Sequence, residues 1–297
     1  MSFHEYIRAV GTGPKSNRVL KENEMKDAME CILNQSVHQE QIAAFLLGWR
    51  VRLETIEELK ITFDVCSKYI KRKTIENSIE LGYPFDGKAD NPYILPLVSK
   101  YLKKFDLNIV ISGDYLQPAK KGLTLKELNE NIKFDENIYY FDRADYFKEL
   151  SQLTTVRNIL GLRTAFNTVE KLLNPGNSKY AINAAFHKPY VIKYNELFAK
   201  NYEHLVIIKG NEGTPEIFSK CKYWLNNDGI ISEYLIDPEY FGINYKKSTS
   251  VISKEESLNM TKNPSDDLEK LAKLNAAMFL IASKKSNDIK EAYEMVN

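Results

Sequence analysis

The chain has 297 residues, a length that suits one large domain or two small ones. Hydrophobic residues make up 43% and charged residues 27%, as in ordinary globular proteins. The formal net charge of +1 excludes an acidic disordered protein and gives no global electrostatic argument for nucleic-acid binding. No apolar run approaches the roughly 20 residues of a membrane span. With three widely spaced cysteines and no signal-peptide pattern at the N-terminus, we expect a reduced, cytoplasmic protein without a membrane partner.

The first 75 residues carry only helical patterns. Apolar side chains recur at helical spacing over residues 25–33. Ser36 and Gln39 have the spacing of a capping box and predict the start of a second helix, and Thr55 with Glu58 predicts a third. Helices joined by such short connections are expected to pack as a small antiparallel bundle, which we assign to residues 1–74.

From about residue 75 onward, short β-rich runs alternate with helical stretches. The predicted strands are Ile79–Leu81, Leu107–Ser112, Ile138–Phe141, Tyr180–Ala184, His204–Lys209 and Gly229–Ile236. The predicted helices are Ile94–Lys104, Thr124–Asn131, Asp145–Leu150, Val156–Leu173, Pro189–Lys200 and Thr214–Leu225, with two more starting at Ser265 and near Asp288. This alternation predicts an α/β domain over residues 75–297, with a mostly parallel sheet covered on both faces. The polar segment Tyr245–Asn263 is expected to form a mobile loop.

Several segments resemble one known family. The most specific is Val156-Arg-Asn-Ile-Leu-Gly-Leu-Arg-Thr-Ala-Phe-Asn167, followed by Leu172-Leu-Asn-Pro175; Gln41–Arg50 is a further match. These segments resemble the anthranilate phosphoribosyltransferase family, glycosyltransferase family 3. The resemblance implies a small helical domain, joined in space by the helical segment around residues 150–175, and a larger α/β domain. It also implies an active site in the cleft between them and a homodimer formed through the N-terminal helices.

The family's glycine-rich turn is altered in this chain. Active members carry Gly-Thr-Gly-Gly-Asp-Gly, whose backbone N–H groups reach the pyrophosphate of phosphoribosyl pyrophosphate. The matching stretch here is Gly82-Tyr-Pro-Phe-Asp-Gly87, and Asn91 follows it. Gly82, Asp86, Gly87 and Asn91 match the family pattern and are candidate substrate-binding residues. Pro84 removes an N–H donor, and the neighbouring Phe85 places bulk where a phosphate should sit.

The second phosphate-contacting loop is altered as well. The family pattern is Lys-His-Gly-Asn-Arg followed by serines, and the matching stretch Ile111–Gly122 keeps only Gly113. Lys120 and Lys121 are candidate phosphate-binding groups that compensate for the lost cations. The family's metal-carrying Asp-Glu pair matches Pro215-Glu216, so one carboxylate is missing. Glu216, with Glu212 nearby, remains a candidate ligand for Mg²⁺ if a phosphorylated substrate binds.

The part of the family's site that would bind anthranilate, the acceptor, matches the family pattern better than the two phosphate-contacting loops do. By the resemblance, Arg157 would hold the anthranilate carboxylate, with Arg163 and Asn167 beside it; alternatively, these residues fix the packing of the two domains. We expect one pocket, of mixed charge, at the carboxyl ends of the strands. Its expected lining is Arg157, Asn167, Asn91, Asp86, Lys120 and Glu216.

Three hypotheses of function follow. The first is a family-3 homologue with a degraded phosphoribosyl pyrophosphate site and without the standard activity. The second is a nucleic-acid-binding protein on the same fold, because a branch of the family lacks the glycine-rich signature and binds nucleic acid. The third is an active transferase with a different anionic substrate. Basic clusters relevant to the second hypothesis are Lys68, Lys71, Arg72 and Lys73; Lys100, Lys103 and Lys104; and Lys120 with Lys121.

Overall fold

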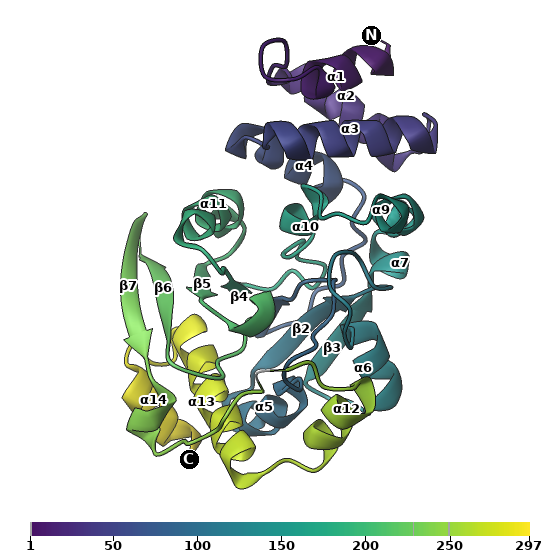
Figure 1. The fold of residues 1–297 in the computed structure, drawn as a ribbon. Coiled ribbons are helices and arrows are strands. Elements are labelled where there is room, and N and C mark those ends of the chain that lie inside the picture. The colour runs from purple at the N-terminus through teal and green to yellow at the C-terminus, as the bar shows by residue number, and fades with distance from the viewer. Residues whose placement is uncertain (1, 228, 249) are drawn as a thin grey trace.

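The computed structural model describes residues 2–227, 229–248 and 250–297. Figure 1 shows a group of helices at the N-terminal end standing on a larger α/β unit. The N-terminal helices are α1 (Phe3–Gly11), α2 (Glu22–Leu33), α3 (Gln39–Arg52) and α4 (Ile56–Ser67). Four short helices lie beneath them: α7 (Arg143–Tyr146), α8 (Lys148–Ser151), α9 (Thr154–Leu160) and α10 (Phe166–Val169).

A single sheet of seven strands forms the centre of the larger unit, in the order β3-β2-β1-β4-β5-β6-β7. Its strands are β1 (Ser78–Gly82), β2 (Asn108–Gly113), β3 (Ile138–Asp142), β4 (Tyr180–Ala184), β5 (His204–Ile208), β6 (Cys221–Asn227) and β7 (Ile230–Ile236). The first five strands are parallel, whereas β6 and β7 add an antiparallel edge. The predicted α/β class with a mostly parallel sheet is therefore confirmed.

The remaining helices cover the sheet. They are α5 (Leu95–Leu102), α6 (Leu125–Asn131), α11 (Lys188–Phe198), α12 (Lys254–Lys262), α13 (Asp266–Ala282) and α14 (Ile289–Val296). Short 3-10 turns occur at Lys103–Phe105, Ala199–Asn201, Asn211–Gly213 and Pro238–Phe241. In Figure 1, α5, α13 and α14 lie below the sheet, while α11 lies above it, toward the bundle.

Two apolar cores meet at the sheet. On β5, Leu205 and Ile207 belong to the core that the sheet shares with the helical bundle, whereas Val206 and Ile208 belong to the opposite core. This alternation follows from the two-residue period of a strand. Because the bundle and the upper sheet face share one core, the bundle is held firmly over the carboxyl ends of the strands. We propose that the boundary between the two units lies at about residue 74.

A buried carboxylate ties the N-terminal helices together. Thr55 caps α4 by accepting a hydrogen bond from the Glu58 N–H at 3.2 Å, as its spacing predicted. The Glu58 side chain, fully buried, accepts from the Trp49 indole at 3.0 Å and pairs with Arg52 on α3. The second predicted cap is displaced. The helix begins at Gln39 with His38 at its N-cap, and Ser36 instead donates to the Cys31 carbonyl at 3.3 Å.

Two other predictions from the pattern are wrong. Residues 221–225 form part of strand β6 and not of a helix, because their side chains are needed on both faces of the sheet. Tyr223 packs into one core and Trp224 into the other. The expected mobile loop over residues 245–263 contains helix α12, which begins where the Ser253 hydroxyl accepts from the Glu256 N–H at 3.0 Å. Residue 249 of that segment lies outside the described residues.

Within the described part of the chain, no helix is both long and apolar enough to cross a membrane.

Candidate functional site

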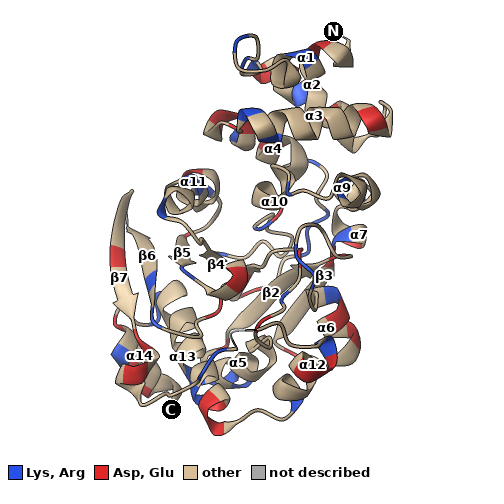
Figure 2. Cartoon of the chain, in the orientation of Figure 1, with Lys and Arg blue, Asp and Glu red and all other residues tan. Residues whose placement is uncertain are grey.

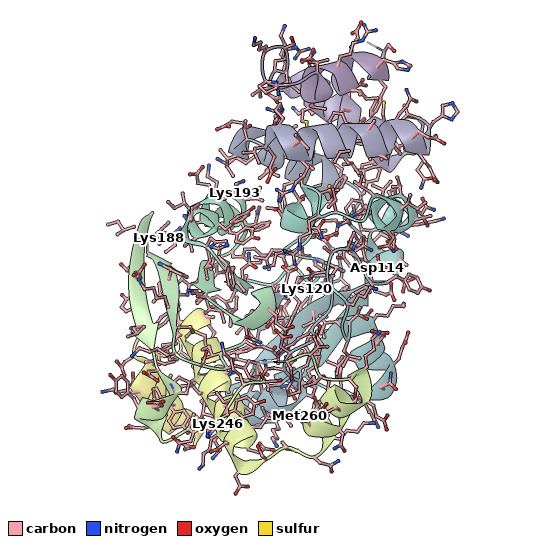
Figure 3. The ribbon with its side chains drawn as sticks, viewed as in Figure 1. Asp114, Lys120, Lys188, Lys193, Lys246 and Met260 are labelled. Carbon is pink, nitrogen blue, oxygen red and sulfur yellow. The ribbon has the colours of Figure 1, made fainter. Side chains whose placement is uncertain are left out.

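A pocket of about 500 Å³ opens between the helical bundle and the carboxyl ends of the parallel strands. Its walls come from loops that follow different strands: Asp86 after β1, Lys120 after β2, Phe186 after β4 and Glu212 after β5. Arg50, near the end of α3, closes it from the bundle side. Figure 3 places Lys120 in the middle of the molecule, between the sheet and the helices above it. The predicted gathering of these loops at one sheet edge is thus present.

The charges in the pocket are mixed. Asp86 is buried and pairs with Arg163, whose Nε lies 3.1 Å from its Oδ2. Glu212 accepts from the backbone N–H groups of Ala89 and Asp90, at 2.7 and 3.0 Å. The Lys120 Nζ donates to the Glu212 carbonyl at 2.8 Å. Among the described residues, no carboxylate lies within ion-pair distance of Lys120 or Arg50, so both cations are available to a ligand.

The turn after β1 is filled by its own side chains. Tyr83 and Phe85 are 2% and 5% exposed. The Tyr83 hydroxyl donates to Glu216 at 3.0 Å, and the Phe85 ring lies 4.3 Å from the Arg143 guanidinium carbon. These side chains occupy the interior of the turn that active family members keep as glycine.

The turn is also fixed to the loop after β2. Lys88 and Leu123 exchange two backbone hydrogen bonds, at 2.9 and 2.8 Å. Gly87 has a φ of +76°, and a Cβ atom there would lie 2.9 Å from the Gly122 carbonyl oxygen. A Cβ atom on Gly122 would lie 2.3 Å from the Lys88 carbonyl oxygen. Only glycine fits at either position, so the two loops form one closed unit.

Glu216 is buried in an ion pair and does not fit a metal site. Its Oε1 accepts from Tyr83 and from the Ile94 N–H at 2.9 Å, and its Oε2 accepts from Lys88 and from the Thr214 hydroxyl at 3.2 Å. Burial lowers the pKa of Lys88, and the Glu216 charge opposes that shift. With both oxygens taken, no lone pair faces the pocket. The described residues contain no group of three or more His, Cys, Asp or Glu side chains arranged to hold a metal ion.

A second buried network occupies the region beside the pocket. Arg157 makes a bidentate pair with Glu170, at 2.7 and 2.8 Å, and Arg143 pairs with both Glu170 and Asp114. All four side chains are essentially inaccessible to solvent. Burial alone would raise the pKa of Glu170, but the two guanidinium groups outweigh it and hold that pKa below its ordinary value. Two cations and two anions thus balance inside the protein.

Lys171 contributes a buried amine to the pocket wall. Its residue is 6% exposed, and its Nζ donates to the carbonyls of Ala184 at 2.8 Å and Gly213 at 3.3 Å. Burial lowers its pKa to about 7. The amine therefore carries only part of a positive charge at neutral pH.

The pocket brings together only some of the residues that the sequence predicted. Asp86, Lys120, Arg163, Asn167 and Glu212 line it. The expectation that Arg157, Asn91 and Glu216 also line it is wrong. Arg157 and Glu216 each form a buried ion pair and do not face the pocket. Asn91 faces the segment around residues 245–248, and its Oδ1 lies 3.4 Å from the Tyr245 hydroxyl. The Asn167 Oδ1 accepts from the Thr164 N–H at 2.9 Å.

The other candidates lie behind or beside the pocket. Gly82 packs against Asn183, and Gly113 against the Tyr140 ring, so each allows a close approach within the sheet. Gly87 joins the two loops described above. Lys121 is exposed and does not line the pocket.

Sequence reasoning missed several buried charges, among them Glu54, Glu80, Lys88, Arg143, Glu170 and Lys171. A signal for the last two was present, because they interrupt the apolar run Val169–Leu173, whose other members are fully buried. Charged residues inside such a run require partners or a function.

Residues 114–297 match the family model described as the glycosyl transferase family a/b domain, and residues 4–61 match the helical bundle domain of the same family. This chain belongs to that glycosyl transferase family and is anthranilate phosphoribosyltransferase-like, which confirms the resemblance drawn from the sequence.

Individual relatives agree with this assignment. The chain is 33% identical to an uncharacterized protein of Aquifex aeolicus (strain VF5), over 66% of this chain and 64% of that protein. It is 27% identical to the anthranilate phosphoribosyltransferase of Petrotoga mobilis, over 97% of this chain and 90% of the relative.

Solved structures share the fold at low identity. The anthranilate phosphoribosyltransferase of Thermus thermophilus superposes with a TM-score of 0.77 at 17% identity, covering 99% of this chain and 92% of that one. The enzyme of Saccharomyces cerevisiae, in complex with phosphoribosyl pyrophosphate and Mg, gives a TM-score of 0.78 at 14% identity and the same coverage.

Proposed function

We propose that this chain binds a small anionic ligand in its pocket and does not perform the standard transfer of phosphoribose to anthranilate. One observation carries the proposal: Tyr83 and Phe85 are buried in the turn after β1, where the transferases of the family need open backbone N–H groups. The pocket beside that turn still offers Lys120 and Arg50 as cations that pair with no carboxylate in the part of the chain that the structure describes.

Groups that the standard reaction needs are missing from this pocket, and their loss supports the proposal that the chain does not transfer phosphoribose to anthranilate. Glu216 has no oxygen free for Mg²⁺, and Arg157 is fully buried in its bidentate pair with Glu170 and does not line the pocket where an anthranilate carboxylate would bind. Removing one donor aimed at a developing charge costs on the order of 3 kcal/mol of transition-state stabilisation. Several such losses together leave no measurable rate.

The purified protein is therefore expected to show no turnover of anthranilate with phosphoribosyl pyrophosphate and Mg²⁺. The assay follows the loss of anthranilate fluorescence, with an active anthranilate phosphoribosyltransferase as the positive control under the same conditions. A turnover number near 1 per second would contradict the proposal.

The proposal that the pocket binds a small anion is tested by titrating inorganic phosphate and pyrophosphate into the protein by calorimetry. Lys120→Met and Arg50→Met should each weaken binding about tenfold, because each removes one direct charge contact. Lys246→Met is the matched control: Lys246 is an exposed lysine far from the pocket, labelled at the lower end of Figure 3, and its loss should change nothing. Equal affinities in all four proteins would reject the pocket as the anion site.

Nucleic acid is the second candidate ligand, and one feature favours it. Phe186 lies at the pocket mouth and is 61% exposed, with the Lys209 Nζ 5.9 Å from its ring centroid, an arrangement on which a base could stack. In the basic clusters elsewhere, three lysines are paired: Lys68 with Glu30, Lys100 with Glu269 and Lys103 with Asp135. Figure 2 shows positive and negative residues intermingled over the ribbon. Salt-sensitive binding of a single-stranded oligonucleotide that is lost in Phe186→Ala would favour this candidate over a small anion.

We further propose that the chain forms a homodimer through its N-terminal helices. Leu46 and Trp49 are buried inside the bundle and offer no surface to a partner. The exposed apolar residues of this region are instead Leu47, Val51 and Leu53, which are 38%, 74% and 65% exposed. Val51→Glu is expected to convert a dimer into a 34.3 kDa monomer in sedimentation at micromolar concentration. A wild-type monomer under the same conditions would contradict the proposal.

A further inference from the structure

Lys171 lines the pocket with an amine that has no role in the proposed binding of an anion. It follows α10 and reaches the space between the loops after β4 and β5. Its Nζ donates to two backbone carbonyls and lies 5.1 Å from the Tyr194 ring centroid, and no carboxylate lies within ion-pair distance among the described residues. A buried ammonium normally has a carboxylate partner, so this amine is placed as if it were to work uncharged.

The two carbonyl acceptors match an uncharged amine. A neutral lysine has two N–H bonds and one lone pair, and the carbonyls of Ala184 and Gly213 take both N–H bonds. The lone pair is then left for the pocket. Burial lowers the pKa of Lys171 to about 7; the charge of Asp86 opposes the shift, and those of Arg163 and Lys120 add to it. The shift favours a neutral, nucleophilic amine.

The surrounding groups indicate what the amine would meet. Lys120 and Arg50 supply positive charge for a phosphate. Asp86 and Glu54 are at least nine-tenths buried, and each has one carboxylate oxygen without a hydrogen-bond donor, Asp86 Oδ1 and Glu54 Oε2. Both residues line the pocket, but these two oxygen atoms are themselves buried, so the cations are the groups that face a ligand. The set fits a small phosphorylated molecule.

We propose that Lys171 forms an imine with a phosphorylated aldehyde or ketone held in this pocket. The proposal rests on the pocket being an anion site. The nitrogen lone pair attacks the carbonyl carbon, and the C=O electron pair moves to oxygen. The amine then loses two protons to that oxygen, which leaves as water when the C=N bond forms. No oxidant or reductant is consumed, and hydrolysis reverses the step.

The test uses glyceraldehyde 3-phosphate and sodium cyanoborohydride with the full-length protein at pH 7. The borohydride reduces any imine to a stable secondary amine, and peptide mass spectrometry then identifies the modified lysine. Lys171 should be labelled at least tenfold faster than Lys188 and Lys193, two lysines of α11 shown in Figure 3. Inorganic phosphate should slow the labelling, and unphosphorylated glyceraldehyde should label at least tenfold more slowly.

The outcomes separate this inference from the function on which it rests. Binding of inorganic phosphate without labelling of Lys171 would overturn the imine and leave the anion site intact. Absence of phosphate binding would overturn the anion site, and equal labelling by the unphosphorylated aldehyde would overturn the ligand class. Labelling spread evenly over exposed lysines would overturn a special role for Lys171. Because the labelling pattern is measured in the wild-type protein, the test does not depend on a variant that folds. As a further check, the labelled peptide should be absent from Lys171→Arg.

Discussion

Replacing Glu170 by glutamine is expected to destabilise the protein by about 3–5 kcal/mol, the cost of breaking a buried ion pair by removing one partner. Among the described residues, Glu170 is the only carboxylate paired with Arg157 and one of two paired with Arg143, and both arginines have no solvent exposure. Without it, two buried guanidinium charges share the single carboxylate of Asp114. Urea unfolding followed by circular dichroism measures the loss.

The matched control is Glu136→Gln. Glu136 is 85% exposed and pairs with Lys103 at 3.5 Å, so its loss should cost under about 1 kcal/mol. The double variant Glu170→Gln with Arg157→Met should be more stable than the sum of the single losses, because it removes the unpaired charge together with its partner. Similar stability of Glu170→Gln and Glu136→Gln would show that the network contributes little.

Glu80 is expected to make stability fall as the pH rises. It is buried on β1, where it accepts from the Tyr202 hydroxyl and from the Asn174 N–H at 3.1 Å. Burial raises its pKa from 4.5 to about 7, and the hydrogen bonds oppose that shift only in part. The folded state therefore holds the proton more tightly than the unfolded state. The stability this confers is complete below about pH 4.5 and is lost as the pH passes through about 7.

Glu80→Gln should remove this pH dependence. A shift of that size corresponds to about 3 kcal/mol between pH 4.5 and pH 8. Glutamine can keep both contacts, because its oxygen accepts from Asn174 while its amide donates to Tyr202. Unfolding free energies at pH 4.5 and pH 8 should therefore differ by about 3 kcal/mol less in Glu80→Gln than in the wild type. Glu76→Gln, an exposed neighbour, serves as the control, and equal pH slopes in all three proteins would contradict the account.

The sequence predicted the parallel strands and the meeting of their loops, because both follow from local patterns. Buried parallel strands are nearly continuous apolar runs, and their carboxyl ends lie at one sheet edge. The sequence patterns did not predict strand β6. It lies between β5 and β7 with Tyr223 and Trp224 buried on opposite faces, and such a run has neither the alternation of a half-exposed strand nor a reliable helical period.

The site was predicted less well, since its charges depend on partners that the sequence does not place. Arg157 matches a family motif, yet its role here is decided by Glu170, which lies 13 positions away and has no counterpart in the quoted motif. The sequence indicates Glu216 as a candidate metal ligand, whereas in the structure it pairs with Lys88, which lies 128 positions away. Residue types indicate what chemistry is available, and pairing across the fold decides which groups remain free.

We propose that side chains of this protein fill the place that phosphoribosyl pyrophosphate and Mg²⁺ occupy in active members of the family. Calorimetric titration of phosphoribosyl pyrophosphate, with and without Mg²⁺, tests this proposal. We expect weak binding that Mg²⁺ does not strengthen and that inorganic phosphate displaces. Micromolar binding that requires Mg²⁺ would contradict it.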